Sequence, residues 1–250
     1  MPKLGKVLIV GAGPGAPDLL TVRAVRSLEQ AEVLLYDRLV HPQTLAIAPS
    51  QAIRIDVGKT VGDPHDIRQN QIFDLMVDYA RQGKTVVRIK GGDPFIFGRG
   101  AEEIEVLIKN GIAWEVVPGL SSALVAPLAA NIPLTYRGIA ASFGVFTPSI
   151  GKGLPERDLQ AAAHVDTAVF LMGVRQIQRI QSDLLAAGKS PSTPVAVIEN
   201  ATWDNQKVHT TNLGSLHLLE GQIQAPAAIV VGETVQVLNQ TATQSWAHAS

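Results

Sequence analysis

The sequence predicts an α/β fold made of two consecutive α/β domains. Short apolar runs alternate with amphipathic segments of helical spacing, which is typical of βα units that build a parallel sheet. After Val117 a Pro/Gly/Ser-rich stretch leads into small apolar residues, and such a change of composition marks a domain boundary. The length of 250 residues is enough for two modest domains. We expect an N-terminal α/β domain over 1–118, a C-terminal α/β domain over 119–240 and a flexible tail over 241–250.

In the first domain each strand is a short apolar run and each helix an amphipathic one. The run KVLIV leads through a glycine-rich loop into a helix that ends near Leu28. Later helices are expected to end at Gly83 and Gly111, because glycine is common just beyond the last residue of a helix. The expected strands are 6–10, 32–36, 52–57, 86–90 and 113–117. The expected helices are one that follows Pro17-Asp18 and runs through Leu28, and those over 67–81 and 101–110.

The second domain repeats the mixed pattern less regularly. Its clearest helix is expected over 174–187, with Gly188 as its stop. The stretch 149–159 holds two glycines and a proline and is expected to be a loop. The expected strands are 141–146, 167–172, 194–198, 208–211 and 227–231.

Composition excludes several classes of protein. The formal net charge is -1 with 17% charged residues, so nothing in the global balance indicates a nucleic-acid or membrane partner. The absence of cysteine removes disulfides, thiolate catalysis and cysteine-ligated metal sites, and fits the reducing cytoplasm. The apolar run at 7–10 is too short for a signal peptide or a membrane span. We expect a cytoplasmic protein that meets any anionic ligand with local cations.

The most informative stretch for function is residues 86–103, VVRIKGGDPFIFGRGAEE. It begins as a strand, breaks at Gly91-Gly92-Asp93-Pro94 and resumes as a helix near Ala101. Adjacent glycines let a backbone approach a ligand where a Cβ would clash. Arg99 stands beside the helix start, where a cation opposes the helix dipole and so favours a role other than stability.

A dinucleotide site is the competing interpretation. Gly11, Gly13 and Ala16 fit the pattern G-x-G-x-x-[GA], and Asp37 follows about 20 residues later, where an acid would bind a ribose. Pro14 and Pro17, however, remove N–H groups that would have to cradle a pyrophosphate. The second glycine loop at 91–93 is also unexplained by a nicotinamide site.

Several motifs taken together resemble the tetrapyrrole methyltransferases, and within them the group that C-methylates uroporphyrinogen III. They are, in order, GAGPGAPDLLTVRA, YDRLV, GKxxG, VVRIKGGDPFIFGRGAEE, VVPGLSSA, IPLTYRG, VFLMG, PVAVIENAT and PAAIVVG, and the resemblance extends over residues 6–237. The resemblance implies the tetrapyrrole methylase fold, a class III methyltransferase with S-adenosylmethionine in the cleft between two α/β domains, usually as a homodimer. It also implies methylation of two ring carbons of uroporphyrinogen III to precorrin-2, for sirohaem, cobalamin or haem d1, with S-adenosylhomocysteine as the other product.

The resemblance also implies which residues line the cofactor. S-adenosylmethionine needs apolar walls, backbone polar groups and close approach more than a phosphate cradle, which glycine loops supply. For Met172 the spacing alone leaves a core methionine equally open. No metal site is expected. The implied cofactor-binding residues are Pro14, Gly91, Gly92, Asp93, Ile96, Ser121, Ser122, Met172, Ala201 and Ala227.

Substrate carboxylates require cations, and proton handling requires an acid or base. Asp37 is the first candidate proton acceptor and Lys59 a donor or carboxylate clamp. The resemblance implies Arg99 with Glu102 as a rival acid/base pair, because family members carry an Arg and a Glu at this spacing. Metal is not needed, because a pyrrole carbon is already electron-rich and must only be held in line with the methyl group. The cations expected beside loops, as partners of substrate carboxylates, are Arg38, Lys59, Arg88, Lys90, Arg99 and Arg137.

The chain departs from the family pattern at a few positions. Thr147-Pro148-Ser149 stands where members usually carry threonine-glycine-histidine, Thr60 replaces an Arg, and Ala201 replaces a glycine. Another precorrin methyltransferase of the superfamily therefore stays open as an alternative, followed by an NAD-binding oxidoreductase or a non-catalytic tetrapyrrole-binding protein.

Overall fold

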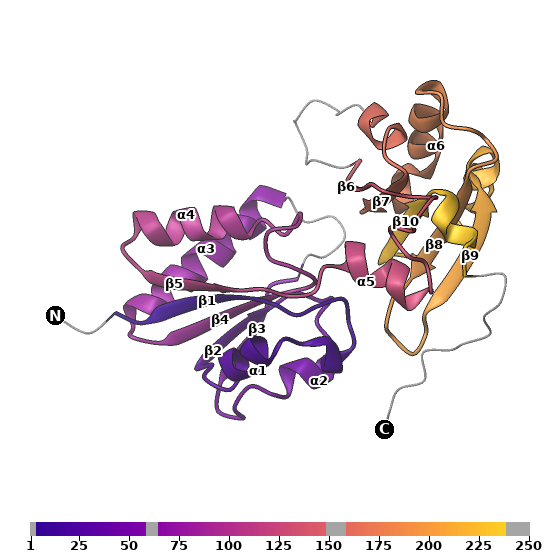
Figure 1. Cartoon of the computed structure of the whole chain (residues 1–250). Helices are drawn as coiled ribbons and strands as arrows, with labels where there is room; N and C mark the ends of the chain where they lie inside the picture. The colour runs from indigo at the N-terminus through magenta and orange to yellow at the C-terminus, as the bar shows by residue number, and fades with distance from the viewer. Residues whose placement is uncertain (1–3, 59–64, 149–158, 239–250) are drawn as a thin grey trace. The chain divides into compact units, whose positions relative to one another are not determined.

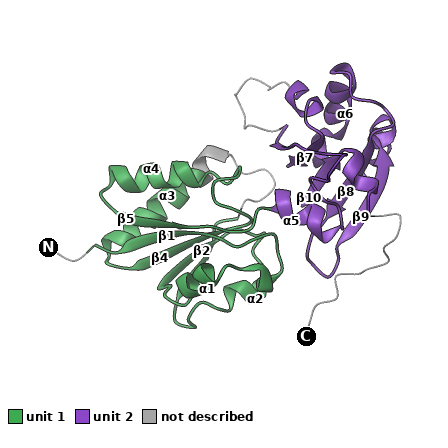
Figure 2. Ribbon diagram, in the orientation of Figure 1, with its two compact units in different colours: residues 1–121 green, residues 122–250 purple. Residues whose placement is uncertain are grey.

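A computed structural model describes residues 4–58, 65–148 and 159–238, with the backbone alone for 65–68. The chain forms two compact units, residues 1–121 and residues 122–250 (Figure 2). Each unit is built on one five-stranded sheet with helices on its faces (Figure 1). The expected α/β class is confirmed. Among the described residues, none of the helices has the length and hydropathy that a bilayer span requires.

The sheet of the first unit is entirely parallel. Its strands lie in the order β3-β2-β4-β1-β5, so β4 is central. Because all strands run the same way, the loops that follow them meet at one edge, where open α/β sheets bind their ligands. The strands are β1 (Lys6–Gly11), β2 (Val33–Tyr36), β3 (Ile53–Asp56), β4 (Thr85–Lys90) and β5 (Ala113–Val117).

Helices cover both faces of this sheet, as strands that are apolar on both sides require. The helices α3 (His65–Arg81) and α4 (Gly100–Lys109) cover one face (Figure 1). The helices α1 (Val22–Leu28) and α2 (Pro42–Leu45) cover the other. Alternation along β1 supplies both cores, since Val7 and Ile9 pack under α3 and α4 while Leu8 and Val10 pack under α1.

The sheet of the second unit is mixed. Its order is β6-β7-β10-β8-β9, with β6 parallel to β7 and the other neighbours antiparallel. Because β10 is antiparallel to β7 and β8, the start of β10 lies beside the ends of both strands. The strands are β6 (Phe143–Phe146), β7 (Thr167–Leu171), β8 (Pro194–Glu199), β9 (Lys207–Asn212) and β10 (Ala227–Val231).

This sheet also has a core on each face. Ile180 and Leu184 of α6 (Ile177–Ala186) belong to one buried cluster, and Ala123 and Ala126 of α5 (Ser122–Ala129) belong to the other. Short 3-10 turns complete the two units at Pro17–Leu19, Gln160–Ala163, Val174–Gln176, Leu213–Leu219 and Glu233–Gln236.

Every expected strand is present, and the differences concern helices. The helix expected after Pro17-Asp18 begins only at Val22, because Thr21 is extended and caps α1. Its Oγ1 accepts from Ala24 N–H at 3.1 Å. The helix expected over 174–187 is likewise a 3-10 turn followed by α6. Helix α5 was not expected at all, since Pro127 lies inside it.

Candidate active site

The glycine loops at the carboxyl edge of the first sheet bond to one another. Gly13 N–H donates to Gly92 O at 3.2 Å and Gly92 N–H donates to Gly13 O at 2.7 Å. Both residues have left-handed φ, +73° and +71°. A Cβ on Gly119, in the loop after β5, would lie 2.3 Å from Gly92 O. The loops after β1, β4 and β5 therefore lie in close backbone contact. Glycine is favoured at position 92 by its left-handed φ within this unit, a reason that the sequence did not reveal.

This arrangement disfavours the dinucleotide interpretation. A pyrophosphate would need the backbone N–H groups of the first glycine loop. Gly13 N–H is already directed at Gly92 O. The Asp37 carboxylate, which would have to bind a ribose, is held by Arg88 at 2.6 Å.

The predicted cofactor residues of the first unit lie in the loops that follow β1, β4 and β5. Pro14 is half-buried in the first of these loops. After β4, Asp93 Oδ1 accepts from Phe95 N–H at 2.9 Å and shapes the turn, while Ile96 stays 38% exposed. Ser121 is buried in the loop after β5, and the next residue, the half-buried Ser122, begins α5 of the second unit. The structure thus brings these residues to one sheet edge with backbone groups and an apolar side chain.

The predicted cofactor residues of the second unit also share one sheet edge. Met172 follows β7 with φ +57° and is 53% exposed, so it is not a core methionine. Ala201 follows β8 between two residues of left-handed φ, Asn200 and Thr202. Strained backbone at an exposed strand end is typical of functional loops. Ala227, at the start of β10, pairs in register with the last residue of β8.

Sequence reasoning missed Glu199, which ties these loops together. It is buried at the end of β8, and its Oε1 accepts from Gln224 N–H. Its Oε2 lies 3.4 Å from His209 Nε2 on β9. The next residue, Asn200, donates its N–H to Pro226 O at 3.0 Å. An acid that ends an otherwise apolar strand was the only signal available.

Asp37 lies at the end of β2 in a network of buried charges. Arg88 Nη2 donates to Asp37 Oδ1 at 2.6 Å, and Arg88 Nε donates to Glu103 Oε1 at 3.3 Å. Lys90 Nζ donates to the same Glu103 oxygen at 2.6 Å. Burial, and then the charge of Arg88, lowers the pKa of Lys90. Burial also acts to lower the pKa of Arg88, but Asp37 and Glu103 outweigh it, so that this pKa is raised.

This network corrects one expectation. Arg88 and Lys90 do not stand beside loops ready for substrate carboxylates, because they are 2% and 5% exposed and already bond to Asp37 and Glu103. Both side chains leave the same face of the central strand, two residues apart. A pair of cations in the middle of a buried sheet requires a buried acid, and that signal could have identified Glu103 in the sequence.

Arg99 and Glu102 form the pair that the sequence suggested. Arg99 Nε lies 3.0 Å from each Glu102 carboxylate oxygen, with Arg99 at φ +59° just before α4. Their side chains are 36% and 48% exposed, so the pair is open to solvent. Gly98 and Gly100 flank Arg99, and both pack closely against the carbonyl oxygen of Pro94. This packing fixes the backbone at Arg99.

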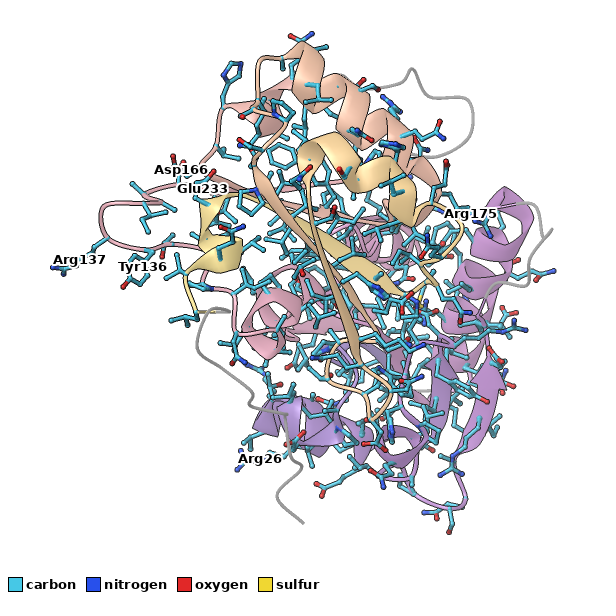
Figure 3. All side chains as sticks on the ribbon, turned by 90° about the vertical axis from the view of Figure 1, so that its right-hand side faces the viewer. Arg26, Tyr136, Arg137, Asp166, Arg175 and Glu233 are labelled. Atoms are coloured by element: carbon cyan, nitrogen blue, oxygen red, sulfur yellow. The ribbon has the colours of Figure 1, made fainter. Side chains whose placement is uncertain are left out.

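Of the remaining predicted cations, Arg38 and Arg137 lie among the described residues. Arg38 Nε lies 4.0 Å from Asp56 Oδ2. Arg137 is exposed beside Tyr136 on a loop that projects from the second unit (Figure 3). Tyr136 and Ala140 close that loop by exchanging two backbone hydrogen bonds. Lys59, Thr60 and Ser149 lie outside the described residues. In the described part of the chain, no group of three or more His, Cys, Asp or Glu is placed to hold a metal ion.

Comparison with known proteins settles the family. The family model of the tetrapyrrole (corrin/porphyrin) methylases matches residues 6–217. The chain belongs to this family. The resemblance seen in the sequence motifs is thereby confirmed.

Solved structures of the family share its fold over nearly the whole chain. The uroporphyrin-III C-methyl transferase of Thermus thermophilus, crystallised with S-adenyl homocysteine, is 39% identical, with a TM-score of 0.81 over 93% of this chain and 94% of that one. A cobalt precorrin-4 methyltransferase is 32% identical, with a TM-score of 0.81 over 92% of this chain and 95% of that one.

Curated relatives are longer than this tetrapyrrole methylase. The siroheme synthase of Pseudomonas putida is 47% identical over 243 residues, which are 95% of this chain and 52% of the relative. That of Hydrogenovibrio crunogenus is 45% identical over 236 residues, 93% of this chain and 50% of the relative. The chain spans about half the length of the curated relatives it matches.

Proposed function

We propose that this tetrapyrrole methylase transfers methyl groups from S-adenosylmethionine to two ring carbons of uroporphyrinogen III and so forms precorrin-2. The observation that carries the proposal is the 39% identity, over nearly the full length of both chains, to a uroporphyrin-III C-methyl transferase that holds S-adenyl homocysteine. The siroheme synthase relatives favour the sirohaem branch of tetrapyrrole synthesis.

The residues at the two sheet edges suit S-adenosylmethionine. Close backbone approach at Gly92, the buried Ser121 and the exposed side chains of Ile96 and Met172 offer polar backbone and apolar contacts without a phosphate cradle. The proposed cofactor residues, drawn from both units, are Pro14, Gly91, Gly92, Asp93, Ile96, Ser121, Ser122, Met172, Ala201 and Ala227.

The cofactor supplies an electrophilic methyl group, so that the ring carbon gains a carbon–carbon bond as the methyl–sulfur bond breaks and a proton remains to be removed. Asp37 is the proposed acceptor of that proton. Its carboxylate is 29% exposed and anchored through one oxygen, Oδ1, by Arg88. Arg99 and Glu102, with Lys59, are proposed to hold substrate carboxylates or to assist in the proton transfer.

We also propose that the protein acts as a cytoplasmic homodimer. The absence of cysteine fits a reducing compartment, and the family resemblance favours a dimer. Sedimentation at micromolar protein concentration measures the oligomeric state, and a monomer there would refute this part of the proposal.

Methylation of a later precorrin is the second candidate. It is favoured by the 32% identity to a cobalt precorrin-4 methyltransferase of equal TM-score. The departure from the family pattern at Thr147-Pro148 concerns the part of the pattern that is associated with the substrate. It therefore bears on the choice between uroporphyrinogen III and a later precorrin.

An anaerobic assay with purified protein, S-adenosylmethionine and uroporphyrinogen III tests the proposal. The expected product carries two added methyl groups and absorbs as a reduced tetrapyrrole. Substrate with esterified carboxylates should bind more weakly, because each charge-assisted bond is worth about 1.5–3 kcal/mol when shielded from water. Methylation of later corrinoid precursors alone would contradict the assigned substrate and leave the family intact.

A further inference from the structure

The buried charges beside Asp37 contain one acid to which the proposed reaction gives no role. Glu103 lies in the first turn of α4 and is 0% exposed. Its Oε1 accepts from Lys90, from Arg88 and, at 3.5 Å, from Gln69 Nε2. Its Oε2 is buried and has no hydrogen-bond partner among the described residues. A buried carboxylate with one oxygen unsatisfied costs stability, so its presence calls for an explanation other than stability.

Arg88 connects this acid to Asp37. Each of its guanidinium nitrogens has a different acceptor: Nε bonds Glu103, Nη1 bonds Ile89 O at 2.8 Å, and Nη2 bonds Asp37. A guanidinium is rigid and planar, so fixing two of its nitrogens fixes the direction of the third. Glu103 therefore determines where Arg88 presents its Nη2 to the Asp37 carboxylate.

The charges in this group balance. The buried cations Arg88 and Lys90 of β4 face the acids Glu103 of α4 and Asp37 of β2. Asp56 of β3 belongs to the adjoining surface, where it lies near Arg38. Loss of one buried charge leaves another uncompensated, and the remaining groups must then move or change protonation.

We propose that Glu103 is a positioning residue for the methyl transfer, acting through Arg88 to hold the Asp37 carboxylate in its working orientation. Glu103 itself touches neither substrate nor cofactor. The inference rests on the proposed function, because it takes Asp37 as the proton acceptor.

Steady-state kinetics with Glu103→Gln tests this inference. The variant keeps an acceptor for Arg88 and removes the charge that balances Lys90. We expect kcat to fall by up to about 100-fold, as for a misplaced catalytic group.

The dissociation constant of S-adenosylhomocysteine should stay within about twofold, because the proposed cofactor loops are untouched. The acidic limb of the pH profile should move to lower pH, because a negative charge near Asp37 is gone. Glu105→Gln, an exposed acid of the same helix, is the matched control and should behave as the parent.

A double-mutant cycle separates positioning from a purely structural role. In an Asp37→Asn background, Glu103→Gln should cause no further loss of kcat, since its effect passes through Asp37. Independent, multiplying effects would overturn the inference. The double variant Lys90→Met/Glu103→Gln restores the charge balance and should recover most of the lost kcat. It also keeps the test available where Glu103→Gln alone does not fold.

A readout without turnover separates failure of this inference from failure of the proposed function. The carboxyl ¹³C signal of Asp37, assigned by its loss in Asp37→Asn, should shift in Glu103→Gln and stay unchanged in Glu105→Gln. An inactive parent protein would refute the proposed function, and the carbon signal would still report the coupling. An Asp37 signal that is identical in the parent and in Glu103→Gln would refute the inference itself.

Discussion

Gly92 combines a backbone conformation that favours glycine with two backbone hydrogen bonds that hold its loop. Its φ of +71° is strained for any L-residue with a Cβ, and its N–H and C=O both bond to Gly13. We expect Gly92→Val to reduce the affinity for S-adenosylhomocysteine by at least tenfold, about 1.4 kcal/mol, because the loop must leave Gly13 to relieve the strain. Isothermal titration calorimetry measures this change.

The chain offers a matched control for backbone strain. Gly111, at the end of α4, has φ +65° with open space where a Cβ would lie. Gly111→Val should carry a similar strain of about 1–2 kcal/mol in stability and bind the ligand as the parent does. Equal affinity in the two folded variants would place the cofactor away from the Gly92 loop.

Asp37 is predicted to serve the proton and not the cofactor. Asp37→Asn keeps an oxygen for Arg88 Nη2 but cannot accept a proton at neutral pH, so kcat should fall by about 10²–10⁴-fold. Affinity for S-adenosylhomocysteine should not change. Single-turnover kinetics and calorimetry separate the two effects. A large loss of cofactor affinity would revive the ribose-binding role that the spacing after Gly11 first suggested.

At the level of single residues, the sequence revealed types of residue but not partners. It singled out Asp37 because a charged residue at the end of an apolar strand is conspicuous, and Arg99 because a cation beside a helix start opposes the helix dipole. Glu102 and its pairing with Arg99 came only from the family resemblance. It assigned Arg88 and Lys90 to the substrate, because burial by α4 is a tertiary event that no local pattern of β4 displays. The bond between Gly13 and Gly92 joins loops far apart in sequence and could not be predicted for the same reason.

Among the elements, Asp166 just before β7 shows how a side chain stabilises a loop. It accepts from Ser142 Oγ at 2.8 Å, Ser142 N–H at 2.8 Å and Ala141 N–H at 2.9 Å. The Ser142 hydroxyl, and then the two N–H groups, lower the pKa of Asp166 below its ordinary value of 3.8. In Figure 3 Asp166 lies near the base of the loop that bears Tyr136 and Arg137.

This depressed pKa has a defined consequence for acid stability. A carboxyl group whose pKa is lower in the folded state contributes stability above its unfolded pKa and loses it as the pH falls through the folded value. Urea unfolding from about pH 7 to pH 3 should therefore show a steeper loss of stability below about pH 4 in the parent than in Asp166→Asn. Asp78→Asn, at an exposed position of α3, is the control and should follow the parent. Parallel curves for the parent and Asp166→Asn would contradict the role given to these hydrogen bonds.

Strands were easier to predict than helices in this chain, for a physical reason. Buried strands read as continuous apolar runs, as in β10, whose bounds were predicted without error. The bounds of the edge strand β5 were also predicted without error, although it is largely exposed. Helix α5 was missed because Pro127 and a run of small apolar residues conceal its periodicity. The strand order of both sheets, and the antiparallel course of β10, depend on contacts between distant segments and were not predictable.

For the whole molecule, ligand binding should appear as stability. A ligand at about 100 times its dissociation constant stabilises the folded state by about 2.7 kcal/mol, and about 2–4 °C per kcal/mol is usual at this length, so S-adenosylhomocysteine should raise Tm by roughly 5–11 °C. NADH should produce no shift, because the Gly13 loop does not present its N–H to a pyrophosphate. Differential scanning calorimetry checks both ligands. A shift with NADH alone would contradict the methyltransferase assignment.

The proposed cofactor residues belong to both units, and hydrogen exchange can test that division. The loop after β4, with Gly91 and Gly92, belongs to the first unit, and the loop after β8, with Ala201, belongs to the second. A ligand that contacts both should slow amide exchange in both, since exchange in such loops proceeds through local opening that the bound ligand suppresses. The exposed helix segment around Asp78 is the internal control and should exchange at an unchanged rate. Protection in the loop after β4 alone would remove Met172, Ala201 and Ala227 from the cofactor site and confine it to the first unit.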